Sequence, residues 1–265
     1  MKLIYTDLDG SLLGHDTYSF VPAQRALQEI QSQRIPLILV TSKTRSEVEF
    51  WRDQLNNRDP FVVENGGGVF IPKAYFPFTV QRAKPRDGYD LIELGEPYQS
   101  VVSALVLASE KSQCKVRGFH EMTVEEVAAV CGIPMEQAEA AKRREFDEPF
   151  DVLDRGKEKR LIEAIQEQGK RWTRGGRFHH ILGGNNKAAA VLALNDLYRQ
   201  VDPCIYTIGL GDSFNDLPFL QVVDAPVLIR SADSEQILAH LPTARLTSKP
   251  GPEGWNDAIL EVISI

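Results

Sequence analysis

Residues 3–10 read LIYTDLDG, and this stretch decides the fold. Its first three residues form an apolar run typical of a short buried strand, and Gly10 permits a sharp exit from that strand. Asp7 and Asp9 are two residues apart in an extended segment, so their carboxylates point the same way and can face one pocket. An Asx-type turn at a strand end uses the same Asp-x-Asp-Gly pattern, so the motif alone leaves that interpretation open.

The segments that follow alternate between short apolar runs and helical patterns. We expect strands at 3–5, 37–40, 61–63, 205–210 and 226–229, and helices at 22–32, 46–55 and 187–198. This βαβαβ order predicts an α/β fold, a Rossmann-like doubly wound parallel sheet that binds ligands at the carboxyl ends of its strands.

The alternation changes after about Pro85. We expect residues 1–85 and 183–265 to form the core, and residues 86–182 to form an inserted α+β cap domain. In the cap we expect strands at 90–94, 115–119, 150–153 and 178–182, and helices at 101–110, 124–130, 135–144 and 158–168.

The two carboxylates of the first segment suit covalent phosphoryl transfer. One of them can attack phosphorus and form an aspartyl phosphate. The other can protonate the leaving alkoxide and later deprotonate the water that hydrolyses the intermediate. The predicted catalytic residues are therefore Asp7 and Asp9.

A second acidic segment reads GLGDSFND at residues 209–216. Asp212 follows a predicted strand, and its carboxylate can complete a hard oxygen shell for Mg²⁺ with Asp7 and a backbone carbonyl near Asp9. We therefore predict Mg²⁺ as the cofactor, with ligands from Asp7, Asp9 and Asp212. The supporting residues are Ser213, Asn215 and Asp216, of which Asp216 can orient Lys187 or a metal-bound water. A Rossmann phosphate loop, the competing interpretation, needs a third glycine that this segment lacks.

Two further segments supply candidate phosphate-binding groups. Lys187 opens a predicted helix, where its ammonium can bind a phosphate oxygen and hold Asp7 anionic. Thr41 ends a predicted strand and can donate its hydroxyl to phosphate, with the adjacent Ser42 as an alternative donor. Taken singly, a lysine is most often a solvated surface charge and a threonine in this position a helix cap.

The bulk composition excludes several classes of protein. With 265 residues, of which 43% are hydrophobic and 25% charged, the chain is globular rather than disordered. A net charge of −7 supplies no basic stripe for nucleic acid and disfavours anionic membranes. No apolar run approaches the roughly 20 residues of a membrane span. We expect no signal peptide, and three scattered cysteines (Cys114, Cys131 and Cys204) indicate buried thiols of a cytoplasmic protein. Nothing in the sequence sets the oligomeric state.

Taken together, the motifs resemble those of the haloacid dehalogenase superfamily of phosphatases. The segments that carry this resemblance are Asp7 to Gly10, Thr41, Lys187 and Gly211 to Asp216, in this order, and the long insertion resembles that superfamily's C2B-type cap. The resemblance implies that Asp7 is the nucleophile and a metal ligand, Asp9 the acid/base and Asp212 a metal ligand, with Thr41 and Lys187 holding the phosphate. Ser11 stands where the superfamily usually has threonine, which keeps a hydroxyl.

A finer resemblance is to mannosyl-3-phosphoglycerate phosphatases. It is carried by segments 40–45, 64–68, 144–148, 175–179 and 250–254. Relatives with generic sugar-phosphate activity tend to carry Thr-Gly-Arg where this chain has Thr41-Ser42-Lys43. The resemblance implies hydrolysis of mannosyl-3-phosphoglycerate to phosphate and the compatible solute mannosylglycerate.

The expected substrate-binding residues of the cap and loops are Asn65, Gly66, Gly67, Arg144, Arg177 and His179. Arg177 can clamp a glycerate carboxylate bidentately, while His179 or Arg144 can read sugar hydroxyls or charge. In the alternative interpretation, both arginines pair with Glu145 and Asp147 on a solvated face.

Four other functions stay open at this point. The glucosyl-3-phosphoglycerate substrate differs in one hydroxyl orientation, and a general sugar-phosphate phosphatase would use the same core. A phosphosugar mutase would keep the phosphoryl group for return to its sugar. A receiver-like module would group acids, a threonine and a lysine on a parallel sheet without turnover.

Overall fold

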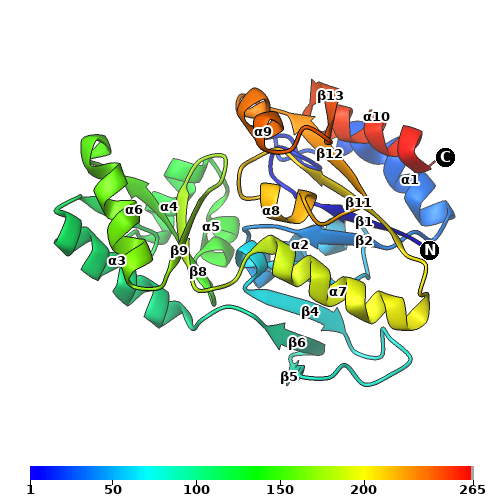
Figure 1. Ribbon diagram of the computed structural model, residues 1–265, viewed down its shortest axis with the longest axis horizontal. Helices are drawn as coiled ribbons and strands as arrows, with labels where there is room; N and C mark the ends of the chain where they lie inside the picture. The colour runs from blue at the N-terminus through cyan, green and yellow to red at the C-terminus, as the bar shows by residue number, and fades with distance from the viewer. Residues whose placement is uncertain (264–265) are drawn as a thin grey trace.

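The computed structural model describes residues 1–263, and within them the larger sheet has nine strands in the order β13-β12-β11-β1-β2-β3-β4-β6-β5 (Figure 1). The strands are β1 (Lys2–Thr6), β2 (Leu37–Val40), β3 (Phe61–Val63), β4 (Gly68–Pro72), β5 (Lys84–Arg86), β6 (Tyr89–Glu93), β11 (Tyr206–Gly211), β12 (Ala225–Arg230) and β13 (Arg245–Pro250). The six strands from β13 to β3 run parallel, which confirms the predicted Rossmann-like α/β core.

Strand β1 lies between β2 and β11, and its register fixes the position of the first acidic segment. Thr6 lies opposite Leu210, and the Asp7 N–H donates to the Leu210 carbonyl at 2.9 Å. The residues that follow β1 and β11 therefore lie next to each other. This is the switch point of a doubly wound sheet, where strands on either side of β1 connect in opposite directions.

Helices cover both faces of the core sheet because each buries one apolar stripe. One face carries α1 (Gln24–Ser32), α2 (Arg45–Gln54) and α10 (Gly251–Ile263), and the other carries α7 (Lys187–Val201), α8 (Leu217–Leu220) and α9 (Ser234–His240). In α1 the buried residues Ala26, Leu27 and Ile30 follow the helical spacing that predicts this element.

A smaller sheet lies beside the core, at the left of Figure 1. Its order is β7-β8-β10-β9, and all neighbours are antiparallel. The elements of this part of the chain are α3 (Tyr98–Ser112), β7 (Val116–Gly118), α4 (Val124–Cys131), α5 (Met135–Ala141), β8 (Asp147–Val152), α6 (Glu158–Glu167), β9 (Arg171–Arg174) and β10 (His179–Leu182). Helices α3 and α6 pack together in one hydrophobic cluster with Phe150 of β8 and Ile181 of β10. We call this part the cap; its α+β composition agrees with the predicted one.

The segment that the sequence predicts as the start of the cap pairs with the core sheet. The strand predicted at 90–94 is β6, which pairs with β4 in the core sheet rather than with the cap strands. Strand β5 extends the same sheet, so the core continues to Glu93. The apolar pattern identifies β6 as a strand, but antiparallel pairing with the unpredicted β4 depends on contacts that no local pattern encodes. We therefore propose a cap that starts after Glu93 instead of at 86.

Other local predictions need smaller corrections. Strands β4, β5, β9 and β13 and helices α9 and α10 had no predicted counterpart. Cys114 and Cys131 are buried as expected, but Cys204 is exposed because it lies in the loop after α7. Among residues 1–263, none of the helices has the length and apolar character that crossing a membrane requires.

Glu64 joins the cap to the core. This residue is fully buried and has a positive φ of 48°, just after β3. Its carboxylate accepts hydrogen bonds from the N–H groups of Glu145, Phe146 and Asp147 at 2.7–3.1 Å. The Arg144 guanidinium lies 3.7 Å from the same carboxylate. One core side chain therefore holds three consecutive amides of the segment that enters β8.

We expect Glu64→Ala to lower the free energy of unfolding by about 3–5 kcal/mol, because it leaves three buried amides without an acceptor and removes a carboxylate that faces the buried Arg144 guanidinium. Chemical denaturation measures this change. Glu136→Ala, at an exposed position in α5, is the matched control and should change the free energy of unfolding by less than about 0.5 kcal/mol. Equal effects of the two substitutions would contradict the role of Glu64.

Candidate active site

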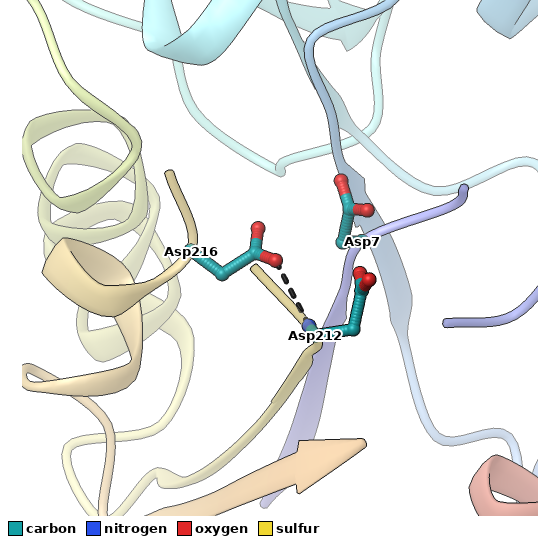
Figure 2. A group of neighbouring side chains, drawn as sticks. All are labelled: Asp7, Asp212 and Asp216. Carbon is teal, nitrogen blue, oxygen red and sulfur yellow. Dashed lines mark hydrogen bonds between the residues drawn. The ribbon is translucent and has the colours of Figure 1, made fainter. Parts of the chain in front are cut away.

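Three buried carboxylates meet at the carboxyl ends of β1 and β11. Asp7 follows β1, Asp212 follows β11, and Asp216 lies four residues farther along (Figure 2). One oxygen of each lies within 4.8 Å of the other two. The parallel pairing of β1 with β11 brings the first two together, and a hydrogen bond from the Asp212 N–H to the Asp216 carboxylate holds the third beside them.

Lys187 lies against this group. Its Nζ is 2.7 Å from Asp7 Oδ1 and 2.6 Å from Asp216 Oδ1. The position is fixed because Lys187 is the first residue of α7, which Asn186 caps by accepting a hydrogen bond from the Ala189 N–H at 2.9 Å. Burial alone would lower the pKa of Lys187, but the carboxylates of Asp216 and Asp7 raise it above its ordinary value, so the ammonium stays charged.

Asp216 organises the loop after β11. Its Oδ2 accepts hydrogen bonds from the N–H groups of Asp212 (3.0 Å, dashed in Figure 2) and Ser213 (3.1 Å), while its Oδ1 faces Lys187. A Cβ at position 211 would lie 2.5 Å from the Asp216 Cβ, so this turn requires Gly211. Both oxygens of Asp216 are engaged, which leaves free ligand positions mainly on Asp7 and Asp212.

The charge of the group suits a divalent cation. Three carboxylates face one ammonium, so the group carries an excess of negative charge in a buried place. Burial, then the charge of Asp216, raises the pKa of Asp7 to about 7. Burial, and then the carboxylates of Asp216 and Asp7, raise the pKa of Asp212. An all-oxygen donor set with this excess charge is what Mg²⁺ prefers.

We expect Mg²⁺ to bind more tightly as pH rises toward 7, because it must displace the proton that Asp7 holds in the metal-free protein. The apparent Kd should fall by up to about tenfold per pH unit below pH 7. The same raised pKa means that the metal-free protein loses stability as pH rises from about 4 to about 7. Thermal unfolding with and without Mg²⁺ at pH 6 and pH 8 measures both effects. A larger Mg²⁺ stabilisation at pH 6 than at pH 8 would contradict the assignment.

Asp9 lies apart from the three carboxylates and pairs with Lys43. Its Oδ2 is 2.9 Å from Lys43 Nζ, and its Oδ1 is buried with no hydrogen bond among the described residues. The same ammonium lies 3.5 Å from Glu47 Oε1. Burial lowers the pKa of Lys43, but Asp9 and Glu47 together raise it above its ordinary value. The side chain of Asp9 is therefore directed to a lysine rather than to the carboxylate group, which leaves the predicted contribution of this position to the metal to its backbone carbonyl.

Lys43 and Glu47 are site residues that were not predicted from the sequence. The available signal was a capping box, in which Thr44 and Glu47 begin α2 and place Glu47 back beside the chain entering the helix. That geometry brings Glu47 close to Lys43.

Thr41 and Ser42 follow β2 as expected but differ in their surroundings. Thr41 is buried, and its hydroxyl oxygen accepts the N–H of Lys43 at 3.2 Å, as in a turn, which leaves its proton free to be donated. Ser42 lines the cavity between core and cap. Among the predicted site residues, those that line this cavity are Asp7, Asp9, Ser42, Arg144, Arg177, Ser213 and Asn215.

A family model that describes haloacid dehalogenase-like hydrolases matches residues 4–241. The chain belongs to this family. The finding confirms the resemblance predicted from the four motifs, and its range takes in the core strands as far as β12, the cap and the loop after β11.

Relatives of this haloacid dehalogenase-like hydrolase include two well-covered proteins. One is the glucosyl-3-phosphoglycerate/mannosyl-3-phosphoglycerate phosphatase of Methanococcoides burtonii, 41% identical, with 98% of this chain and 97% of the relative covered. The other is the mannosyl-3-phosphoglycerate phosphatase of Pyrococcus furiosus, 35% identical, with coverages of 86% and 91%. Among solved structures, a subclass IIB sugar phosphatase of the superfamily aligns over all of both chains with a TM-score of 0.68 and 18% identity, which shows a shared fold.

In this hydrolase the cap histidine that faces the cavity is His180, and not His179 as predicted. His179 Nδ1 accepts from Trp172 Nε1 at 3.0 Å, and its ring lies beside Phe150, in the layer of α3 and α6. Successive residues of a strand point to opposite faces, so of the two neighbours in β10 only one side chain can point into the cavity. The sequence signal was the apolar Ile181, which shares the face of His179.

The two cap arginines are largely engaged by protein groups. Arg144 is buried; it pairs with Asp147, as the alternative interpretation had it, and donates to the Ser42 carbonyl at 2.7 Å. The pair is buried, however, and does not lie on a solvated face. Arg177 donates to the carbonyls of Cys131 and His15, the latter at 3.3 Å, so it bridges the cap and the loop after β1.

The glycines after β3 serve close packing rather than the cavity. A Cβ at Gly66, whose φ is +89°, would lie 2.2 Å from the Asn186 carbonyl oxygen. A Cβ at Gly67 would lie 2.3 Å from the Cβ of Phe146. Neither glycine lines the cavity, and neither does Asn65. This loop approaches the chain before Lys187 and the cap, and its contact with the substrate stays a prediction.

Proposed function

We propose that this phosphatase hydrolyses 2-O-mannosyl-3-phosphoglycerate to mannosylglycerate and inorganic phosphate, with Mg²⁺ as cofactor. The observation that carries the proposal is the contact of Lys187 with Asp7, beside Asp212 and with Asp9 on the cavity wall. The names of the relatives support the substrate class. The glucosyl compound is a second candidate because the Methanococcoides burtonii relative is named for both.

Asp7 is the nucleophile in this proposal. Its carboxylate lies at the cavity, and Lys187 keeps it in position and supplies a positive charge for a phosphate oxygen. Attack by one Asp7 oxygen forms an aspartyl phosphate as the bond from phosphorus to the glycerate oxygen breaks. Thr41 and Ser42 donate hydroxyl protons to the phosphate oxygens.

Asp9 moves the proton. In its protonated form it gives the proton to the leaving glycerate oxygen, and as a carboxylate it then takes one from the water that attacks the aspartyl phosphate. Lys43, whose Nζ is 2.9 Å from Asp9 Oδ2, holds the Asp9 side chain at the cavity wall. Each turnover therefore returns Asp9 to its starting state.

Asp7 and Asp212, with the loop held by Asp216, would hold the Mg²⁺ ion. The ion supplies positive charge that offsets the negative charge of the transferring phosphoryl group. The buried position of the donor oxygens and their excess charge support this assignment.

A phosphate-release assay over a substrate panel tests the proposal. The panel contains the mannosyl and glucosyl 3-phosphoglycerates, simple sugar phosphates, and a sugar phosphate with and without a bisphosphate activator. We expect release from the glycosyl-3-phosphoglycerates to exceed release from simple sugar phosphates. Broad weak release would support a general sugar-phosphate phosphatase, and activator-dependent isomerisation would support a mutase. A lasting aspartyl phosphate without turnover would support a receiver-like module.

Two further proposals concern the binding partner and the cellular location. We propose a phosphorylated sugar–glycerate as the partner, with no nucleic acid or membrane, and a cytoplasmic location for the synthesis of a compatible solute. The negative net charge supports the absence of a nucleic-acid partner.

A further inference from the structure

Asn65 connects four segments of the active-site region. Its side-chain Oδ1 accepts from Asn215 Nδ2 at 3.0 Å, and its Nδ2 donates to Asp147 Oδ2 at 2.7 Å. Its backbone N–H donates to the Thr41 carbonyl at 3.0 Å, and its carbonyl accepts from Asn185 Nδ2 at 3.4 Å. The residue is 2% exposed, so all four contacts are made inside the protein.

Each contact leads to a different functional segment. Asn215 belongs to the loop that carries Asp212 and Asp216, and Asn185 lies two residues before Lys187. Thr41 is a proposed phosphate-binding residue. On the cap side, Asp147 pairs with Arg144 and lies 3.1 Å from His180 Nδ1, and both of these partners line the cavity.

The polarity of these bonds requires asparagine. One end of the side chain must accept from an amide, and the other must donate to a carboxylate. An aspartate would place an oxygen against Asp147, and an alanine would remove both side-chain hydrogen bonds. The backbone is left-handed, with φ 55° and ψ 35°, a conformation that asparagine tolerates better than most residues.

We infer that Asn65 is a positioning residue that couples the cap to the loop carrying Asp212. The bonds through Asp147 make the arrangement of the cavity-facing Arg144 and His180 dependent on the same side chain that holds Asn215. A displacement of Asp147 should therefore change the position of Asn215, and a displacement of Asn215 that of Asp147. This inference rests on the proposed function only for its kinetic consequence; the structural coupling stands without it.

A double-mutant cycle with exchanged groups tests the coupling. The variants are Asn65→Asp, Asp147→Asn and both together. In the double variant, the carboxylate introduced at position 65 can accept from both amides, so a hydrogen bond between positions 65 and 147 returns with its polarity reversed. Asn56→Asp is the matched control, since Asn56 has a similar φ of 49° but is exposed.

Hydrogen exchange of the metal-free protein gives the readout that does not depend on turnover. Asn65→Asp should speed exchange at least about threefold in segment 211–216 and also in segment 145–148, because the misplaced side chain no longer holds either segment. The double variant should restore protection in both segments, and the control should change neither. Faster exchange in only one segment, or no recovery in the double variant, would overturn the coupling.

Steady-state kinetics adds the functional readout. In Asn65→Asp, kcat should fall about tenfold or more with a smaller change in KM, since misplacement of catalytic groups lowers the rate of the chemical step. The double variant should recover to within about threefold of the wild type. If Asn65→Asp fails to fold, Asn65→Ala and the double variant still decide. Wild-type kcat and KM in both single variants would overturn the inference, whereas an inactive wild type would instead refute the proposed function.

Discussion

Replacing Asp7 by asparagine is expected to reduce phosphate release by at least about 10⁴-fold, because an amide cannot form the acyl phosphate. The substitution keeps the shape of the side chain and removes one of three mutually repelling carboxylates. The variant should therefore stay folded, and without metal at pH 8 it should be at least as stable as the wild type. Initial rates with the mannosyl compound, together with thermal unfolding, measure the two effects.

The control for this experiment is an aspartate outside the site. Asp53→Asn changes an exposed carboxylate that pairs with Arg58 on the surface, so it should leave the rate within about twofold of the wild type. If Asp7→Asn kept a hundredth or more of wild-type turnover, Asp7 would not be the nucleophile. A water molecule in the cavity would then have to attack phosphorus directly.

Replacing Asp9 by asparagine should lower kcat about 10²–10⁴-fold, the usual contribution of a general acid–base. The stabilisation by Mg²⁺ should persist, because the Asp9 carboxylate pairs with Lys43 and is not one of the three grouped carboxylates. Turnover and the Mg²⁺-induced shift in melting temperature are measured on the same preparation.

The two readouts separate the possible functions of Asp9. Near-normal turnover would show that the acid–base assignment is wrong. A lost Mg²⁺ stabilisation would show that the side chain of Asp9 is a metal ligand, contrary to the predicted contribution of a backbone carbonyl at this position. Lys43→Met provides a further comparison, since it removes the charge that faces Asp9 while leaving the grouped carboxylates in place.

Local patterns suffice to predict the centre of this fold. Each of the strands β1, β2 and β11 contains an apolar run and is followed directly by a polar residue of the proposed site: Asp7, Thr41 and Asp212, respectively. Since parallel strands end at the same edge, the meeting of these residues follows from the alternation of strands and helices. Lys187 begins α7, the helix that leads into β11, and helices of this alternation begin at the edge where the parallel strands end.

Contacts between distant segments could not be predicted in this way. The pairing of β6 with β4 is antiparallel and depends on which sheet edge is free. The burial of Arg144 depends on Glu64 and Asp147, which are brought together only when the cap lies on the core. The choice between His179 and His180 depends on which face of the cap sheet α3 and α6 cover. No single segment contains this information.

The central claim is that the phosphoryl group is transferred to the Asp7 carboxylate before water releases it. Trapping this aspartyl phosphate tests the claim most directly. The wild-type enzyme is mixed with the mannosyl compound and Mg²⁺, quenched in acid within milliseconds and reduced with borohydride, which converts an aspartyl phosphate into homoserine. We predict homoserine at position 7, present only with substrate and Mg²⁺ and absent from Asp7→Asn. Rapid turnover with an unmodified Asp7, or with homoserine at another aspartate, would contradict the account.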